Sequence, residues 1–268
     1  MFQTREDIIL TPDEEQIILG TLLGDGCLTK GRTTGSSARL SCNHGEVQRP
    51  YVEWKAAHLK RLVTSVRTTN NGGYGQYNCR LTTVSVPSLR HLYDEIYLDG
   101  HKTIGPWIYR IAGLGLATWF MDDGQGGKCN TRSISTHSFG YDEQIVLLSW
   151  LSSVWNVKTQ IRVDDRQQKY YLRIMEPGTS PLFDTIRPYI IPSMIHKMPN
   201  WDWPETTCPI CQTVFRKSKP ASVYCSKKCS KRAYYLRYQD DIKARCRDYS
   251  LRQKAGREET AQGYTDQE

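Results

Sequence analysis

Two short apolar segments stand out in the pattern of hydrophobic and polar positions, because each ends in an acidic residue followed by glycine. They are ILGTLLGDG, residues 18–26, and LATWFMDDG, residues 116–124. Apolar residues cover most sides of a helix in both segments, so we expect two buried helices. Asp25 and Asp123 fall at the helix C-terminus, where the helix dipole makes a carboxylate costly. The repeated arrangement indicates that the two carboxylates bind a divalent metal ion.

The first apolar segment follows a strong helix start. Thr11 is a good N-cap, Pro12 suits the first helical position, and Glu14 completes a capping box. Gly20 and Gly24 are four residues apart, a spacing that lets another helix approach closely. We expect this helix to run to Gly24 and to pack against its repeated counterpart.

The remaining pattern predicts the same order of elements after each apolar segment. After the first come paired strands over residues 27–43, a helix at 48–62, paired strands around 70–73 and a helix at 87–97. After the second come an extended stretch at 128–139, a helix at 141–155, a hairpin at 157–174 and a helix at 180–189. This repeated order indicates an internal duplication.

A pair of lysines supports the duplication. Asp25 and Asp123 are 98 positions apart, and Lys102 and Lys197 are 95 apart. Each lysine follows a histidine and precedes a proline and a tryptophan. We therefore expect two similar halves, residues 1–98 and 99–200, related by a pseudo-twofold axis through the two apolar helices.

Two ionised carboxylates placed side by side by these helices repel each other, so they need a proton or a cation between them. Oxygen ligands favour Mg²⁺, and such a site suits phosphodiester hydrolysis. Lys102 and Lys197 would polarise water or neutralise charge on the phosphate. The plainer alternative is that the lysines are solvated surface charges and the acids ordinary helix ends. Asp122 has no acidic counterpart, since Gly24 stands in its place, and we expect it to be secondary and to contribute a backbone carbonyl.

Charge and cysteine content narrow the class of protein. The net charge of +8 favours a polyanionic partner, and the fourteen Lys and Arg against three acids between residues 208 and 257 account for the whole excess. No apolar run approaches the roughly 20 residues of a membrane span, and no apolar leader follows Met1. Nine cysteines and no leader suggest an intracellular protein, in the cytoplasm of a bacterium or phage-infected cell or in an organelle matrix.

The two apolar segments resemble the paired motifs of single-chain LAGLIDADG homing endonucleases. The resemblance covers about residues 11–200 and includes STHSF and RPYIIPSMIHKMPN, which are similar to mitochondrial intron-encoded members. It implies an α+β fold, a pseudo-twofold pair of αββαββα units whose saddle-shaped antiparallel sheets lie along the DNA major groove. It also implies cleavage of a long, rare target with short 3′ overhangs. The site residues that it implies are Asp25 and Asp123 as metal ligands, the carbonyls of Gly24 and Asp122 as helpers, and Lys102 and Lys197 at the edge of the active site.

Basic side chains recur on the predicted strands and turns, among Thr, Ser, Asn and Gln that can hydrogen-bond to base edges. They are candidates for DNA contacts, although most single charges on strands are simply solvated. The set is Lys30, Arg32, Arg39, Arg80, Lys128, Arg132, Arg162, Arg166 and Arg173.

A cysteine cluster follows a predicted linker at residues 201–207. Two close pairs, CPIC and CSKKC, are separated by thirteen residues and lead into a basic helix, SKRAYYLRYQ. Four thiolates in two close pairs predict a tetrahedral Zn²⁺ site, which so short a segment needs in order to fold. The predicted zinc ligands are Cys208, Cys211, Cys225 and Cys229.

The cluster resembles the small zinc-ribbon or treble-clef modules attached to mobile-element nucleases, which implies such a module over residues 208–240. We expect a basic to polar, partly disordered tail at 241–268. Basic residues around the cluster predict contacts with the DNA backbone. A zinc module that serves only stability or protein contacts is the alternative. The basic residues of its helix are Lys227, Lys228, Lys231 and Arg232.

The sequence as a whole predicts a monomeric, Mg²⁺-dependent, site-specific double-strand DNA endonuclease with no membrane partner. Two alternatives stay open: a maturase on the same fold that binds intron RNA, and a DNA-binding regulator that does not cut. Both alternatives predict that Asp25→Asn or Asp123→Asn leaves activity intact, whereas the nuclease would lose cleavage and keep binding.

Overall fold

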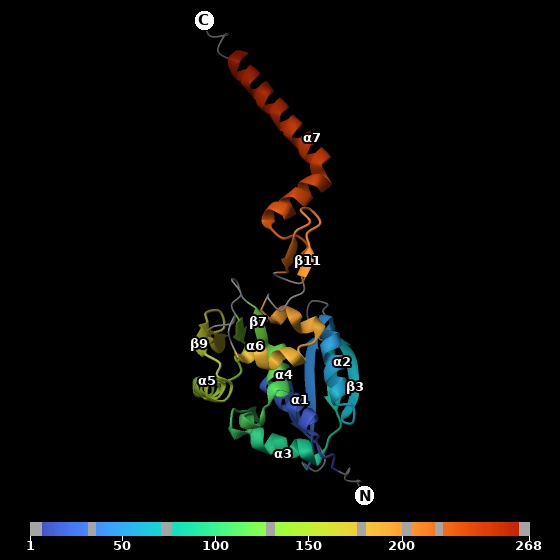
Figure 1. Cartoon of the computed structure of the whole chain (residues 1–268), viewed down its shortest axis with the longest axis vertical. Helices are drawn as coiled ribbons and strands as arrows, with labels where there is room; N and C mark the ends of the chain where they lie inside the picture. Colours follow the sequence, from blue (N-terminus) through green and yellow to red (C-terminus); the bar gives the residue numbers. More distant parts are fainter. Residues whose placement is uncertain are drawn as a thin grey trace. The chain divides into compact units, whose positions relative to one another are not determined.

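A computed structural model gives the arrangement of the chain (Figure 1). The residues it describes are 7–31, 36–70, 77–126, 132–175, 181–199, 205–217 and 222–262. The chain divides into two compact units, 1–202 and 203–268.

The first unit contains the same series of elements twice. The first half has α1 (Pro12–Leu23), β1 (Gly26–Lys30), β2 (Ala38–Gly45), α2 (Arg49–His58), β3 (Val63–Asn70), β4 (Tyr77–Thr83) and α3 (Pro87–Ile96). The second half has α4 (Gly113–Asp123), β7 (Gly124–Gly126), β8 (Arg132–Ile134), α5 (Tyr141–Trp155), β9 (Thr159–Asp164), β10 (Lys169–Ile174) and α6 (Pro181–Ile186). Short elements complete the unit: β5 (Tyr97–Leu98), β6 (His101–Lys102), and the 3-10 helices η1 (Glu46–Gln48), η2 (Pro106–Arg110), η4 (Arg187–Tyr189) and η5 (Pro192–Lys197).

Each half builds a four-stranded antiparallel sheet with the same strand order. The order is β1-β2-β4-β3 in the first half and β7-β8-β10-β9 in the second. Helix α2 packs on the first sheet and α5 on the second, while α1 and α4 lie between the two sheets (Figure 1). The predicted pair of αββαββα units is confirmed.

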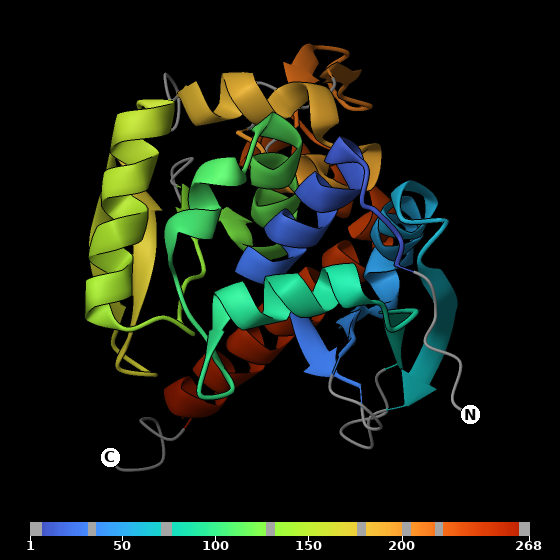
Figure 2. The same cartoon turned by 90° about the horizontal axis from the view of Figure 1, so that it is seen from below.

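The contact between α1 and α4 depends on small residues. Thr11 caps α1 and exchanges hydrogen bonds with Glu14, so the predicted capping box is present. A Cβ atom placed on Gly20 would lie 2.3 Å from the carbonyl oxygen of Gly115 in α4. Only glycine at position 20 permits this approach, and the two helices lie side by side at the centre of the unit (Figure 2). The expected packing of one apolar helix against the other is confirmed.

Several boundaries differ from the prediction. The short strand β7 was not predicted, because three residues rich in glycine carry no alternating pattern. Helix α2 ends at His58 instead of residue 62. Position 128, where an extended stretch was expected to begin, lies outside the described residues.

The second unit consists of a hairpin and a long helix. Strands β11 (Glu205–Thr207) and β12 (Val214–Arg216) are antiparallel, and α7 (Lys227–Gln262) follows, with a non-helical residue at Tyr238. The last three residues of the predicted linker therefore form a strand, and the helix extends well into the predicted tail. Within the described ranges, no helix is long and apolar enough to cross a membrane.

Candidate active site and nucleic-acid interface

The two predicted acids occupy different positions at the ends of the central helices. Helix α1 ends at Leu23, so Asp25 follows the helix, whereas Asp123 is the last residue of α4. The side chain of Asp25 is 45% exposed, and Asp123 is less accessible. Burial and the nearby Asp25 carboxylate raise the pKa of Asp123 to about 8. The second acid therefore holds a proton near neutral pH unless a cation comes close.

Lys102 lies at the C-terminal end of α1, and Lys197 lies at the C-terminal end of α4. Lys102 Nζ donates to the carbonyl oxygens of Gly24, at 3.0 Å, and Gly26, at 3.2 Å. Lys197 Nζ donates to the carbonyls of Met121 and Asp122. Burial lowers the pKa of both lysines. Both cations stand where the helix dipole is negative, so they offset the destabilising effect of an acid at the same helix end.

A buried ion pair next to the acids escaped the sequence prediction. Lys55 Nζ of α2 lies 2.7 Å from Oδ1 and 3.0 Å from Oδ2 of Asp122, and both side chains are at most 1% exposed. Burial opposes the charge on Lys55, but Asp122 raises its pKa overall. Asp122 therefore acts through its side chain as well as through its backbone carbonyl, and the side-chain contact was not predicted. Lys55 shares a helix face with the buried residues Tyr51 and Leu59, and a lysine on such an apolar face was the available signal.

His44 of β2 lies between the acids. Its Nδ1 atom is 3.5 Å from Asp25 Oδ2, and its Nε2 atom is 3.6 Å from Asp122 Oδ1. Burial and, less strongly, Lys55 lower the pKa of His44. Ligand atoms of Asp25, His44 and Asp122 all lie within 4.8 Å of one another, a group that could hold a metal ion.

One face of the first sheet is open and polar. Strand register places Arg39 beside Thr29, and Arg80 beside both Asn43 and Arg67. Arg39, Arg67 and Arg80 are all exposed. Arg67 was not among the predicted residues, although it sits on a strand of the same sheet.

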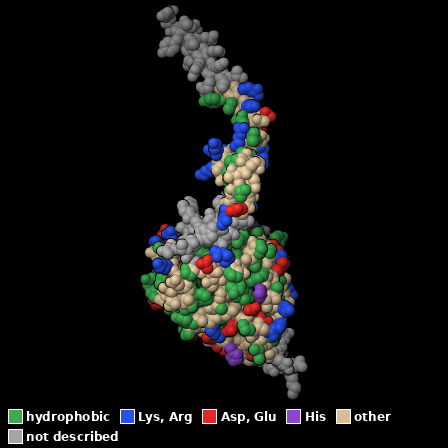
Figure 3. All heavy atoms as spheres, in the orientation of Figure 1, with side chains coloured by type: hydrophobic (Ala, Val, Ile, Leu, Met, Phe, Trp, Pro, Cys, Tyr) green, Lys and Arg blue, Asp and Glu red, His purple; other side chains and the backbone are tan. Residues whose placement is uncertain are grey.

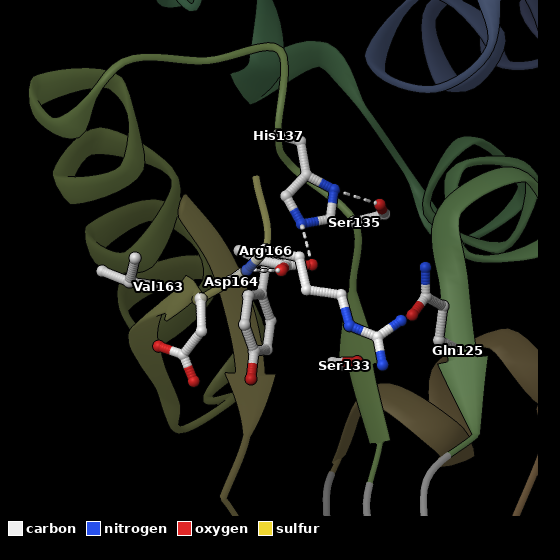
Figure 4. Close-up of a pocket in the computed structure, with 9 residues that line it drawn as sticks. Gln125, Ser133, Ser135, His137, Val163, Asp164 and Arg166 are labelled. Atoms are coloured by element: carbon white, nitrogen blue, oxygen red, sulfur yellow. Dashed lines mark hydrogen bonds and ion pairs between the residues drawn. The ribbon is translucent and has the colours of Figure 1, made fainter. Parts of the chain in front are cut away.

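The second sheet has a matching open face with a hollow of about 400 Å³ (Figure 4). His137 in this hollow lies 2.8 Å from Ser135 Oγ and 3.9 Å from Asp164 Oδ2. Arg166 in the β9–β10 turn extends over the same hollow. Strand register places Arg162 opposite Tyr171, and it places Arg173 opposite Gln160 and Ser133. The predicted residues Arg162, Arg166 and Arg173 therefore share the open face of the second sheet.

Two of the predicted DNA-contacting residues are turned away from the open faces. Arg132 is 5% exposed and donates to the carbonyls of Lys197 and Met198, because its register position faces the core. The prediction that Arg132 reads DNA is wrong. Lys30 shares the inward register of Leu28, and its Nζ lies 4.6 Å above the Tyr93 ring of α3. Two further predicted residues, Arg32 and Lys128, lie outside the described residues.

The four predicted zinc ligands come together in the second unit. Cys208 and Cys211 lie in the β11–β12 connection, Cys225 precedes α7, and Cys229 lies in its first turn. All four sulfur atoms are within 4.8 Å of one another, with Cys225 Sγ 3.4 Å from Cys211 Sγ and 3.6 Å from Cys229 Sγ. Although burial opposes ionisation, backbone N–H groups lower the pKa of Cys208 to about 6. The basic residues predicted in α7 are exposed, and blue side chains lie along the helix in Figure 3.

The fold is a pair of αββαββα units with one acid from each half at the ends of the two central helices. Residues 15–180, more than half of the chain, match the family model described as the LAGLIDADG DNA endonuclease family. The protein belongs to this family.

Solved structures and curated proteins similar to this chain carry several different names. The structure of the homing endonuclease I-WcaI bound to its DNA recognition sequence is similar in fold, with a TM-score of 0.64 at 22% identity, over 73% of this chain and 89% of that one. The DNA endonuclease I-ChuI of Chlamydomonas applanata is 25% identical over 70% of this chain and 95% of its own. Protein RecA of Mycobacterium gastri is 28% identical over 71% of this chain and 48% of its own length. The chain thus spans about half the length of the first curated relatives that it matches.

Proposed function

We propose that the protein is a site-specific endonuclease that cuts both strands of DNA with a divalent metal, Mg²⁺, and leaves short 3′ overhangs. The observation that supports this most directly is the convergence of one acid from each half between two open, arginine-bearing sheet faces. Because one chain carries both halves, a monomer would suffice. Membership in a DNA endonuclease family supports the same activity.

The residues present fit a hard divalent cation. Burial and the Asp25 carboxylate raise the pKa of Asp123 although Lys102 and Lys197 oppose the shift, so a further cation would favour the ionised form of both acids. Asp25 and Asp123 would hold the metal, with the carbonyls of Gly24 and Asp122, which each keep a second lone pair after accepting from a lysine. A bound Mg²⁺ would supply activation of water and stabilisation of the leaving oxygen.

The side chains of the protein would hold the helix ends and the substrate. Lys102 and Lys197 keep positive charge beside the acids, and this charge favours approach of the scissile phosphates. Arg39, Arg80 and Arg162 on the open faces would contact phosphates or guanine edges. The neighbouring Ser, Thr and Asn side chains would add hydrogen bonds to other bases.

We also propose that the second unit binds one Zn²⁺ and extends the DNA contact. Ligands 2.3 Å from a tetrahedral zinc ion lie about 3.8 Å apart, close to the sulfur distances of 3.4 and 3.6 Å. One cysteine pair lies in a hairpin, and the other lies at the start of a helix. This arrangement favours the treble clef over the zinc ribbon, the other predicted form of the module. The basic residues of α7 would bind phosphates without reading sequence.

The decisive experiment is cleavage of a randomised duplex library with Mg²⁺ present or omitted. We expect sequence-selective, Mg²⁺-dependent products from the wild-type protein. Asp25→Asn or Asp123→Asn should reduce cleavage about a thousandfold, equivalent to about 4 kcal/mol, and leave DNA binding unchanged. The exposed acid Asp142 of α5 gives a control, since Asp142→Asn should cut normally. A folded, zinc-loaded protein that yields no metal-dependent products would refute the proposal.

A second function is favoured by one comparison. Cytochrome b mRNA maturase bI2 of Debaryomyces hansenii is 25% identical over 74% of this chain and 79% of its own. A maturase would bind intron RNA on the same fold, and its activity would survive Asp25→Asn and Asp123→Asn. RNA splicing assays with the two variants therefore separate the two functions.

A further inference from the structure

The ion pair between Lys55 and Asp122 breaks the symmetry of the two halves. Strand register equates Cys42 with Ile134, because these residues face Gly26 and Gly124, the glycines that follow the two acids. By the same register His44 corresponds to Thr136. The first half therefore has an ionisable histidine at this register position, and the second half has a neutral threonine.

The remaining members of the ion-pair network also lack charged counterparts. Lys55 and Leu147 are each the seventh residue of their helix, α2 and α5. Asp122 corresponds to Gly24, since each immediately precedes an acid. The second half thus has a neutral, buried set in Leu147 and Thr136, whose hydroxyl donates to Gln144 at 2.7 Å.

Gly24 makes the asymmetric arrangement possible. A Cβ atom at Gly24 would lie 2.5 Å from Asp122 Cβ and 2.6 Å from Asp122 Oδ2. The absence of a side chain in the first half thus admits the carboxylate of the second. Asp122 reaches across to Lys55 and His44, which both belong to the first half.

The network holds Asp25 at two points. The backbone N–H of Asp25 lies beyond the end of α1 and donates to Asp122 Oδ2 at 3.3 Å. Lys55 Nζ lies 3.5 Å from His44 Nε2, and because an ammonium group can only donate, the histidine proton belongs on Nδ1. That atom faces the Asp25 carboxylate at 3.5 Å and Gln48 Oε1 at 3.2 Å.

The same geometry argues against a third metal site. Asp25, His44 and Asp122 are close enough to share a metal ion. However, the Lys55 ammonium group already lies within 3.0 Å of both Asp122 oxygens and 3.5 Å of His44. The cluster therefore contains a cation supplied by the protein itself.

We propose that Lys55, Asp122 and His44 are positioning residues for Asp25 alone, and that they make the two strand-cutting centres non-equivalent. This inference rests on the proposed endonuclease function. Asp123 ends a regular helix, which fixes its backbone without the network. Loss of the network should therefore slow the cut made with Asp25 more than the cut made with Asp123.

The test uses variants that remove the network without leaving a buried charge. Lys55→Met combined with Asp122→Asn removes both charges at similar volume, and His44→Ala removes the group that faces Asp25. The matched control is Leu147→Met, at the position equivalent to Lys55. Thermal unfolding of each full-length protein records any loss of stability.

Cleavage is followed on a supercoiled plasmid carrying a target selected from the randomised library, and on the same duplex end-labelled on either strand. In the network variants, we expect one strand to be cut about tenfold or more slowly than the other, so that nicked circles accumulate. Leu147→Met should keep the ratio between the cutting rates of the two strands that the wild type shows. Equal slowing of both strands, whether or not the melting temperature falls, would overturn the inference, because that is the result of a purely structural role.

A second measurement does not require cleavage. Titration of the DNA-free proteins with Mn²⁺, followed by electron paramagnetic resonance, should show about tenfold weaker binding in the network variants and unchanged binding in Leu147→Met. Unchanged affinity in the network variants would overturn the inference. A wild type that binds Mn²⁺ and cuts no DNA would refute the proposed function instead.

Discussion

Asp123 shows how a single residue responds to burial and to a like charge. Its pKa is raised from 3.8 to about 8 by burial and by Asp25, so folding without a divalent metal takes up a proton across this range. The contribution of the protonated Asp123 carboxyl group to the stability of the fold is fully present below about pH 4. This contribution is lost as the pH rises through 8. Binding of a metal cation must expel this proton, so metal affinity should rise with pH up to about 8.

The pH dependence can be isolated with Asp123→Asn. In Mg²⁺-free buffer, we expect the wild type to lose stability relative to this variant between pH 5 and pH 9, because only the wild type carries the titrating carboxyl group. Urea unfolding of both proteins at several pH values gives the difference. Parallel curves for the two proteins would contradict the assignment.

Arg132 and Arg162 differ in their surroundings although both are arginines on strands of the second sheet. Arg132 is buried against two carbonyl groups, whereas Arg162 is exposed. Arg132→Met should cost about 1–3 kcal/mol of unfolding free energy, since it leaves buried carbonyls without their donors. Arg162→Met should change stability by less than about 0.5 kcal/mol and weaken DNA binding. Chemical denaturation and DNA titration measure the two effects, and a reversed pattern would refute the strand register.

At the scale of elements, the packing of α1 on α4 places both acids. Gly20→Ala would put a methyl group 2.3 Å from a backbone oxygen that cannot move independently. We expect a loss of about 1–3 kcal/mol or more in unfolding free energy, which outweighs the better helix propensity of alanine. Gly45→Ala is the control, because nothing lies within 4 Å of its Cβ position. Equal stability of the two variants in urea unfolding would show that the helices can separate at no cost.

At the scale of the whole molecule, the two units should respond separately to loss of zinc. Cys208→Ser removes a buried ligand from the four-cysteine cluster, so the second unit should lose its bound zinc and its fold. The first unit has its own core and should stay folded. Zinc content by mass spectrometry, together with limited proteolysis, tests this expectation. A wild-type protein without zinc after purification in zinc-containing medium would contradict the proposed module.

The sequence alone determined the features that depend on local pattern. Residue spacing identified the two apolar helices, the duplicated order of elements and the four clustered cysteines, because periodicity and ligand spacing are properties of the chain itself. It also identified Asp25, Asp123, Lys102 and Lys197, which the fold brings to adjoining helix ends.

Only the tertiary structure decided which side of a strand each residue faces and which distant residues meet. A shift of one residue in register turns a side chain to the opposite face, and for this reason Arg132 was assigned to DNA although it faces the core. The contact of Lys55 with Asp122 joins residues 67 positions apart in different halves. This pairing depends on how closely the end of α1 approaches α4. Gly24 at the end of α1 has no side chain, and its place opposite Asp122 of α4 sets that approach.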